Sequence, residues 1–179
     1  MFVYNMVDFG ALSGQIAGEE VAMTQDRIAE ALSDQFTRTW EMFREAVLAF
    51  PADEWRKGEF DYLRPAGVAL HFVETADFYS DDQSADEFPW GGRFGVGWED
   101  RRSERLPTQE QLIVYVDEVE KKVEAWLHST DFLSQEQQFP YTGPIILGRA
   151  MYLLRHNQHH LAEMCLELTR RGFQSPGWK

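Results

Sequence analysis

Apolar residues recur every three or four positions along a long segment near the start of the chain, the spacing of one face of an α-helix. This stripe consists of Ile28, Leu32, Phe36, Trp40, Phe43, Val47 and Phe50. Pro51 follows directly and ends the segment, because proline cannot continue a helix. We therefore predict a first amphipathic helix over roughly residues 20–50. Residues 1–18 have no clear period, and we expect an N-terminal strap that covers a bundle face or a partner subunit.

Start and stop signals predict three further helices. Pro65 is suited to the first position of a helix. Thr108 and Gln111 form a capping-box pair ahead of an apolar stripe. The last helix should begin at Pro144 and end near Gly172, where glycine favours a left-handed terminus. The four predicted helices span roughly residues 20–50, 65–79, 108–129 and 144–171.

A stretch without helical period separates the second and third predicted helices. Residues 80–106 are rich in glycine, aspartate and arginine, which indicates a long connection. Its aromatic residues suggest that it is tied to the helices rather than disordered. They are Phe88, Trp90, Phe94 and Trp98. Because no segment is convincing as a strand, we predict one all-α domain over residues 1–179, a four-helix bundle with this long connection.

Charge and cysteine content narrow the range of functions. The 17 basic and 30 acidic side chains give a formal charge of −13, which disfavours binding to nucleic acids and anionic membranes. No apolar run approaches the ~20 residues of a membrane span, and the first basic residue is Arg27, unlike the basic start of a signal peptide. We therefore expect a cytoplasmic protein with a small-molecule substrate. Cys165 is the only cysteine, which excludes internal disulfides and thiolate clusters.

Two histidines on the last predicted helix are the first candidates for chemistry. On a helical wheel of about 100° per residue, His160 falls about 40° from His156, whereas His159 turns toward solvent. Side chains four residues apart have β-carbons about 5–6 Å apart, so two imidazoles can share one cation. His156 and His160 are therefore the usable pair. Taken alone, such a pair also occurs on surface helices that bind nothing.

A third histidine comes from the second predicted helix. His71 lies among apolar residues, where a lone histidine is usually a hydrogen-bonded core residue. Three imidazoles from two helices, however, match a common ligand set for Zn, Ni, Co or Fe(II) with a position left open. We therefore predict a divalent metal site at His71, His156 and His160. Glu74 is a candidate fourth ligand, orienting partner or general base, or else a solvated surface carboxylate.

The other polar and aromatic candidates have more ordinary interpretations. Three charged residues on the histidine side of the last helix are available as partners of the ligands. They are Arg149, Glu163 and Glu167. We interpret Cys165 as a small buried hydrophobe and His128 as a partner of its helix dipole. Trp90 and Trp98 either wall a substrate pocket or anchor the connection.

Several familiar motifs are absent from the chain. A ferritin-like di-iron bundle needs Glu-x-x-His on each of two helices, which does not occur here. A zincin protease needs His-Glu-x-x-His, whereas residues 157–159 are Asn, Gln and His. There is no Walker loop, Rossmann fingerprint or Gly-x-Ser-x-Gly elbow. These classes of metal, nucleotide and hydrolase site are therefore disfavoured.

Three segments carry a family resemblance. They are Val68–Glu74, which contains His71, the Leu-Pro-Thr-Gln-Glu-Gln-Leu segment Leu106–Leu112, and Leu154–Leu161. On these segments the chain resembles the DinB/YfiT-like superfamily of damage-inducible, metal-dependent proteins, from the first long helix through Gly172. The resemblance implies a four-helix bundle with an unusual helix order, commonly a homodimer. It also implies that one histidine of the second helix and a His-x3-His pair of the last helix bind a divalent metal.

This chain departs from the family pattern at two places. Leu161, Ala162 and Glu163 replace the glycine and glutamine that often follow the histidine pair, and the connection around Phe88–Trp98 is unusually long. Characterised members include thiol-dependent transferases and isomerases, so the resemblance implies a low-molecular-weight thiol as a cofactor. These departures leave the substrate open.

Three functions remain in competition at this point. The leading hypothesis is a metal-dependent transferase or hydrolase, in which Zn, Ni or Fe lowers the pKa of a bound water or thiol. The second is a non-catalytic metal-binding or stress-response module. The third is a helical interaction protein whose histidines are packing residues.

Overall fold

The computed structural model describes residues 9–97, 100 and 104–179, and it is built from helices. The long helices are α1 (Phe9–Ala49), α2 (Pro65–Tyr79), α3 (Gln109–Ser129) and α4 (Ile146–Arg170). Two short 3₁₀ helices, η1 (Asp61–Leu63) and η2 (Pro140–Thr142), lie in the connections. The described residues contain no strand, only an isolated bridge between Gln135 and Ile145. The predicted all-α, four-helix fold is therefore confirmed.

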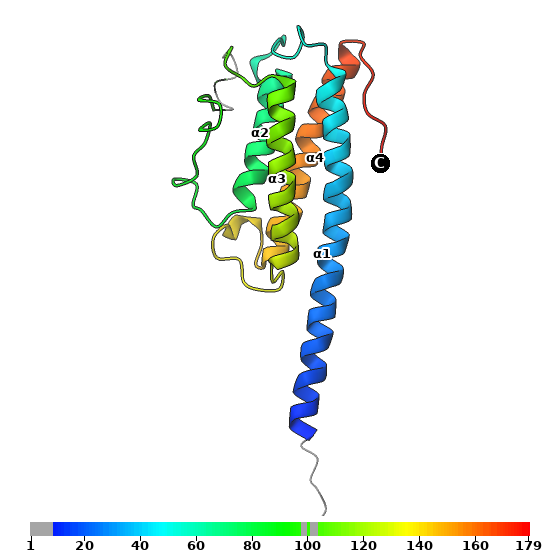
Figure 1. The fold of residues 1–179 in the computed structure, drawn as a ribbon, viewed down its shortest axis with the longest axis vertical. Coiled ribbons are helices and arrows are strands. Elements are labelled where there is room, and N and C mark those ends of the chain that lie inside the picture. The colour runs from blue at the N-terminus through cyan, green and yellow to red at the C-terminus, as the bar shows by residue number, and fades with distance from the viewer. Residues whose placement is uncertain (1–8, 98–99, 101–103) are drawn as a thin grey trace, which may run out of the picture.

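The start of α1 lies earlier than the predicted residue 20. The helix begins at Phe9, so the second part of the expected strap is helical, while residues 1–8 lie outside the described residues. Gln25 Nε2 donates a hydrogen bond to Asp131 Oδ1 (2.6 Å) in the connection before α4. The part of α1 before Gln25 projects beyond the other helices (Figure 1). Because a projecting helix needs no face that packs on the bundle, this part of the sequence has no helical period.

Local signals set several other helix ends as predicted. Pro65 is the first residue of α2. The capping box at α3 is complete, because the Gln111 N–H donates to Thr108 Oγ1 (3.3 Å) and the Thr108 N–H donates to Gln111 Oε1 (2.9 Å). Beyond α4, Gly172 has a φ of 77°, the left-handed conformation that glycine adopts without strain.

The start of α4 is the other helix boundary that differs. The helix begins at Ile146 rather than Pro144. The Pro144 carbonyl instead accepts a hydrogen bond from the Glu136 N–H (3.1 Å), and Gln135 forms its bridge with Ile145. Contacts with the preceding connection therefore hold this segment extended.

The helices are not neighbours in the order of the sequence. α2 packs against α3 and α4, and α1 packs against the same two helices, so α1 and α2 lie diagonally across the bundle. α2 and α3 both start at the end of the bundle where α1 finishes (Figure 1). The chain must therefore return along the bundle between them, and residues 80–106 make this crossover. Their length, predicted from sequence, follows from the parallel direction of the two helices.

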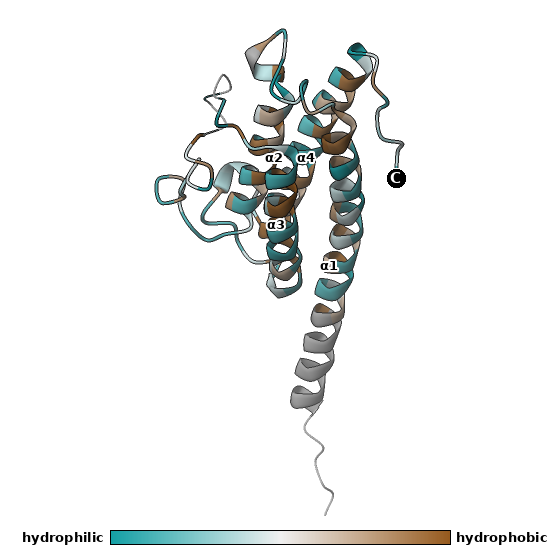
Figure 2. Cartoon of the chain, turned by 45° about the horizontal axis from the view of Figure 1, so that its top comes forward, coloured by the Kyte–Doolittle hydropathy of each residue, from teal (hydrophilic) through white to brown (hydrophobic). Residues whose placement is uncertain are grey.

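Aromatic side chains fill the centre of the bundle, where α1 and α2 meet. The rings of Phe43 and Phe72 stack with centroids 3.8 Å apart, and Trp40 contacts Phe72 edge-on at 5.3 Å. All three are buried, and each such side chain contributes about 1.5–3 kcal/mol to stability. Hydrophilic and hydrophobic positions alternate around the helices (Figure 2).

No helix among the described residues is both long and apolar enough to span a membrane.

Candidate metal centre

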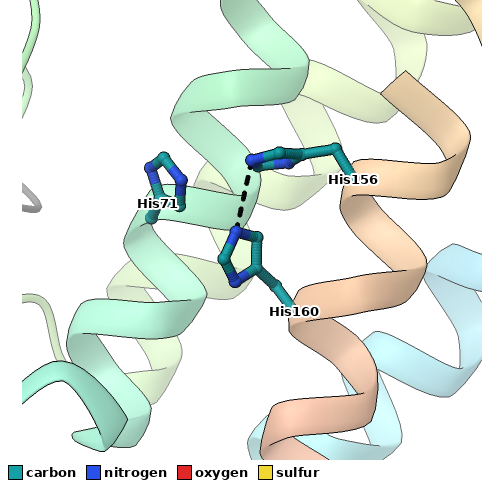
Figure 3. A group of neighbouring side chains, drawn as sticks. All are labelled: His71, His156 and His160. Carbon is teal, nitrogen blue, oxygen red and sulfur yellow. Dashed lines mark hydrogen bonds between the residues drawn. The ribbon is translucent and has the colours of Figure 1, made fainter. Parts of the chain in front are cut away.

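The three predicted histidines converge from two neighbouring helices. His71 lies on α2, and His156 and His160 lie one turn apart on α4. The His71 ring centroid is 5.0 Å from that of His156 and 4.7 Å from that of His160. One nitrogen from each ring lies within 4.8 Å of the other two. In Figure 3, His156 and His160 extend from α4 toward α2, which carries His71.

The spacing of the ring nitrogens suits a single cation. Nε2 of His156 and Nε2 of His160 face each other at 3.2 Å (Figure 3). Two nitrogens bound at about 2.0–2.1 Å to one tetrahedral ion lie about 3.3 Å apart. Among the described residues, no group hydrogen-bonds the buried Nδ1 of His156. This nitrogen therefore has no hydrogen-bonding partner within the described part of the chain. By their chemistry and spacing, the three imidazoles fit a divalent ion such as Zn, Ni or Fe(II).

The surroundings of His156 keep its imidazole neutral. Burial, together with the neighbouring His160, lowers the pKa of His156 to about 4, although a contact with Asn157 opposes the shift. A histidine binds metal only when its nitrogen carries a free lone pair, which protonation removes. At neutral pH His156 is therefore in the form that a metal requires.

Two hydrogen-bonding groups lie at the outer nitrogens of the other histidines. Glu163 Oε2 lies 2.7 Å from Nδ1 of His160. A carboxylate in this position accepts the Nδ1–H, fixes the ring orientation and leaves the lone pair on Nε2. Thr75 Oγ1 lies 3.4 Å from Nδ1 of His71, a longer contact on the same helix. Of the charged partners predicted for the ligands, Glu163 is the one that the structure places beside them.

The other two predicted charged partners lie elsewhere. Arg149 forms an ion pair with Glu136, and Glu167 forms ion pairs with Arg170 and Arg171. Both predicted residues share the correct side of α4, but they sit about two turns, roughly 11 Å, along the axis from the nearer histidine. The prediction was therefore wrong for Arg149 and Glu167.

Glu74 is neither a surface carboxylate nor one of the converging ligands. Its residue is only 2% exposed, and Oε1 accepts a hydrogen bond from the Gly91 N–H (2.8 Å). The second oxygen, Oε2, is buried without a partner. Burial raises the pKa of Glu74 to about 7, with Asp77 reinforcing and the Gly91 N–H opposing the shift. Glu74 thus holds the crossover connection to α2, and the metal-ligand group does not include it.

The remaining candidates agree largely with their interpretations. His159 is exposed, as the helical wheel predicted, and its Nε2 lies 3.4 Å from Glu163 Oε1. His128 lies in the last turn of α3, where it also contacts Glu124 (3.0 Å). Cys165 is half-buried at the edge of the core, less enclosed than predicted. Trp98 lies outside the described residues.

A cavity of 590 Å³ opens beside the histidines. Its lining includes His71 and His156, together with Thr75 and Gly97. The rest of the lining is aromatic and consists of Phe78, Tyr79, Trp90 and Tyr152. This volume falls within the range of about 300–1,000 Å³ that is usual for small-molecule sites. Two of the three candidate metal ligands, His71 and His156, therefore line a space large enough for a small molecule.

The cavity walls were only partly predicted from the sequence. Trp90 lines the cavity, as expected if this residue forms a wall of a substrate pocket. Tyr79 and Tyr152 were missed. Tyr152 precedes His156 by four residues and so shares its face of α4, a signal that the spacing already contained. The position of Tyr79 depends on tertiary packing, and its hydroxyl is 2.7 Å from that of Tyr141.

No family model, curated protein or solved structure matches this chain. The resemblance to the DinB/YfiT-like superfamily, carried by the segments Val68–Glu74, Leu106–Leu112 and Leu154–Leu161, therefore stays a prediction.

Proposed function

We propose that this chain is a divalent-metal-dependent enzyme, a transferase or hydrolase of small molecules, with the metal held by His71, His156 and His160. The observation that carries the proposal is the convergence of three imidazoles from two helices beside an aromatic-lined cavity. Three neutral histidines leave at least one coordination position for a substrate. A purely structural site would instead close the coordination sphere with protein groups.

The residues of the chain would divide the work at such a site. When bound, a divalent cation supplies Lewis acidity that favours the anionic form of a water or thiol. Burial keeps His156 neutral, and Glu163 orients His160. The aromatic walls exclude water and hold an apolar substrate beside the histidines. The sequence resemblance supports a low-molecular-weight thiol as the second reactant.

Metal analysis tests the proposal directly. The full chain would be stripped with a chelator, incubated separately with Zn(II), Ni(II) and Fe(II), and analysed for bound metal after gel filtration. We expect about one equivalent for the wild type, and none retained by His71→Ala or by the double variant His156→Ala, His160→Ala. His128→Ala, which removes a histidine from α3, should bind like the wild type. If the wild type retains no metal, the proposal is wrong.

Activity of the metal-loaded protein then separates the enzyme from a non-catalytic metal-binding module. The hydrogen bond between Glu74 and the Gly91 N–H favours the enzyme, because Glu74 is held by the connection instead of filling the open position. Loaded protein would be screened with small thiols against chloro-aromatic and epoxide substrates. Thiol consumption that requires both metal and His71 supports the enzyme. A metal that only raises the melting temperature supports the alternative module.

We also propose that the protein forms a homodimer through the projecting part of α1. Val21 and Met23 lie there two residues apart, with 53% and 51% of their surface exposed, and a second copy of the chain could cover them. Replacing both by lysine should convert a dimer to a monomer in sedimentation velocity. Leu48→Lys, at an exposed position of α1 within the bundle, should leave the dimer intact. A monomeric wild type would contradict the proposal.

A further inference from the structure

Arg155 is a cation without an acidic partner beside the candidate metal centre. It precedes His156 on α4, it is exposed, and its guanidinium carbon lies 5.3 Å from the centroid of the Tyr152 ring. Within the described part of the chain, no carboxylate forms an ion pair with it. Six other arginines do have carboxylate partners, namely Arg38, Arg44, Arg93, Arg149, Arg170 and Arg171. In a chain of net charge −13, Arg155 thus offers an unneutralised positive charge at this place.

A second hollow lies beside Arg155 and shares two lining residues with the cavity. This hollow has a volume of 250 Å³ and is lined by Tyr152, Arg155, His156 and His159. Tyr152 and His156 also line the 590 Å³ cavity. The Tyr152 ring lies nearly parallel to the His156 ring, with an interplanar angle of 22° and centroids 6.4 Å apart. Because the same two side chains border both spaces, the hollow that Arg155 lines adjoins the cavity that His71 and His156 line.

The cavity itself favours a flat, apolar group. The rings of Phe78 and Trp90 lie with centroids 4.9 Å apart, and Tyr79 contacts Tyr152 at 5.2 Å. Aromatic walls of this kind bind planar ligands by offset or edge-on stacking at centroid distances of about 4.5–7 Å. The two spaces therefore differ in character: one is walled by aromatic rings, and the other presents a guanidinium.

We infer that the substrate of this site is a small carboxylate with a planar apolar body, whose carboxylate is bound by Arg155 while the body lies in the aromatic cavity beside the three histidines. This inference rests on the proposed metal-dependent function. A guanidinium offers two parallel N–H donors that match the two oxygens of a carboxylate. In a strongly acidic protein, this single cation selects an anion at one end of the cavity and so fixes the direction in which the substrate lies.

Paired probes that differ only in charge test the inference. Zinc-loaded full-length protein would be titrated in a calorimeter with 3-phenylpropanoate and with 3-phenylpropanamide, which have the same planar body. We expect the carboxylate to bind roughly tenfold more tightly than the amide, as is typical of charge-assisted hydrogen bonds. Arg155→Gln should weaken binding of the carboxylate to the level of the amide and leave binding of the amide unchanged.

A matched variant controls for the change in net charge. Lys121→Gln removes one positive charge from α3, where Lys121 lines a separate hollow with Thr37 and Glu120. It should bind both probes like the wild type. Circular dichroism checks that both variants are folded, and because Arg155 and Lys121 are exposed, no loss of core packing is expected.

The other results distinguish this inference from the proposed function. Equal affinity of wild type and Arg155→Gln for the carboxylate, as direct binding to zinc would produce, overturns the role of Arg155. Failure of zinc-loaded protein to bind either probe overturns the substrate class and leaves the metal site standing. Elemental analysis of the same samples shows whether zinc is bound. If zinc does not load, the titration is repeated with Ni(II) or Fe(II), and protein that retains none of the three metals refutes both proposals together.

Discussion

Two polar clusters that involve α4 differ in how completely the protein satisfies their hydrogen-bonding groups. Near the start of α4, Arg149 pairs with Glu136 through two hydrogen bonds, from Nε to Oε2 (2.6 Å) and from Nη2 to Oε1 (3.0 Å). Glu136 Oε1 also accepts the backbone N–H groups of Gln138 and Phe139, each at 2.9 Å. The Arg149 guanidinium covers the Phe139 ring at 4.6 Å. Protein groups thus satisfy this buried ion pair from several sides.

About two turns further along, the histidine cluster lacks this saturation. His156 and His160 turn their Nε2 atoms toward each other, and Nδ1 of His156 is buried without a partner. Burial raises the pKa of Glu136, but Arg149 and the Phe139 N–H outweigh it and keep that pKa below its usual value. At His156, burial and the neighbouring His160 outweigh the opposing contact with Asn157, and the pKa falls to about 4. Protein groups thus complete the ion pair, whereas the three histidines form a group that could hold a metal ion.

The largest expected effect comes from breaking the ion pair. Glu136→Ala leaves buried Arg149 with only the exposed Asp82, at 3.7 Å, as an acidic partner, so the free energy of unfolding should fall by about 3–5 kcal/mol. Gln137→Ala, at the exposed neighbouring position, should change it by less than about 0.5 kcal/mol. Urea unfolding of metal-free protein, followed by circular dichroism, measures both values.

The histidine cluster should respond differently in the same experiment. His156→Ala removes a half-buried imidazole whose Nε2 contacts His160 and whose Nδ1 has no partner, so we expect a loss below about 1.5 kcal/mol without metal. With zinc present, the variant should lose the stabilisation that metal gives to the wild type. A loss of 3 kcal/mol or more for metal-free His156→Ala would mean that the histidines, like the ion pair, serve the fold.

The buried carboxyl group of Glu74 is only half satisfied, because Oε1 accepts a hydrogen bond and Oε2 does not. The stability of the fold should therefore depend on pH. Burial raises the pKa of its carboxyl from 4.5 to about 7, with Asp77 reinforcing the shift and the Gly91 N–H opposing it. Between these pH values the folded state holds a proton that the unfolded chain has lost. The stability contributed by this proton is therefore complete below pH 4.5 and is lost as the pH rises through 7. The loss should be on the order of 2 kcal/mol.

A comparison of variants isolates this contribution. His156 acts in the opposite direction, because its pKa is lowered from 6.5 to about 4. The unfolded chain therefore binds this proton more readily, which destabilises the fold in acid and has no effect above pH 6.5. Glu74→Gln cannot ionise, so the difference in unfolding free energy between this variant and the wild type should shift in favour of the variant from pH 4.5 to pH 8. Glu30→Gln, at an exposed position of α1, should show no shift. A constant difference for Glu74→Gln would contradict the raised pKa.

Sequence reasoning reached the histidines because helix geometry is local. The four-residue spacing of His156 and His160 places them on one face whatever the tertiary structure, and the same geometry turned His159 outward. Helix limits marked by Thr108 or Gly172 were also correct, because each cap forms with residues close in sequence. His71 was found only by assuming that the second and last helices pack together, which the structure confirms.

Features that depend on the connections could not be predicted in this way. Glu136 meets Arg149 from a segment without helical period, and Glu74 is buried by the crossover rather than by a helix. Nearly every residue of α2 is buried, so its wheel has no solvent side that would reveal where a carboxylate lies. The projecting start of α1 was missed because periodicity reports packing, and this part of the helix projects beyond the other helices.

The smallest expected effect is a change in zinc affinity when Glu163 is replaced. It tests whether a carboxylate supports the histidine cluster as Glu136 supports Arg149. Glu163→Gln keeps an oxygen that can accept the His160 Nδ1–H at the place where Oε2 lies (2.7 Å), but it removes the charge. We expect zinc affinity to fall by about tenfold, the lower end of what outer partners of metal ligands contribute. Glu124→Gln alters the carboxylate beside His128 on α3 and should leave zinc affinity unchanged. Unchanged affinity in Glu163→Gln would mean that packing alone orients His160. A tenfold loss would mean that the chain prepares these imidazoles for metal with the same device, an accepting carboxylate, that completes the buried pair of Arg149 and Glu136.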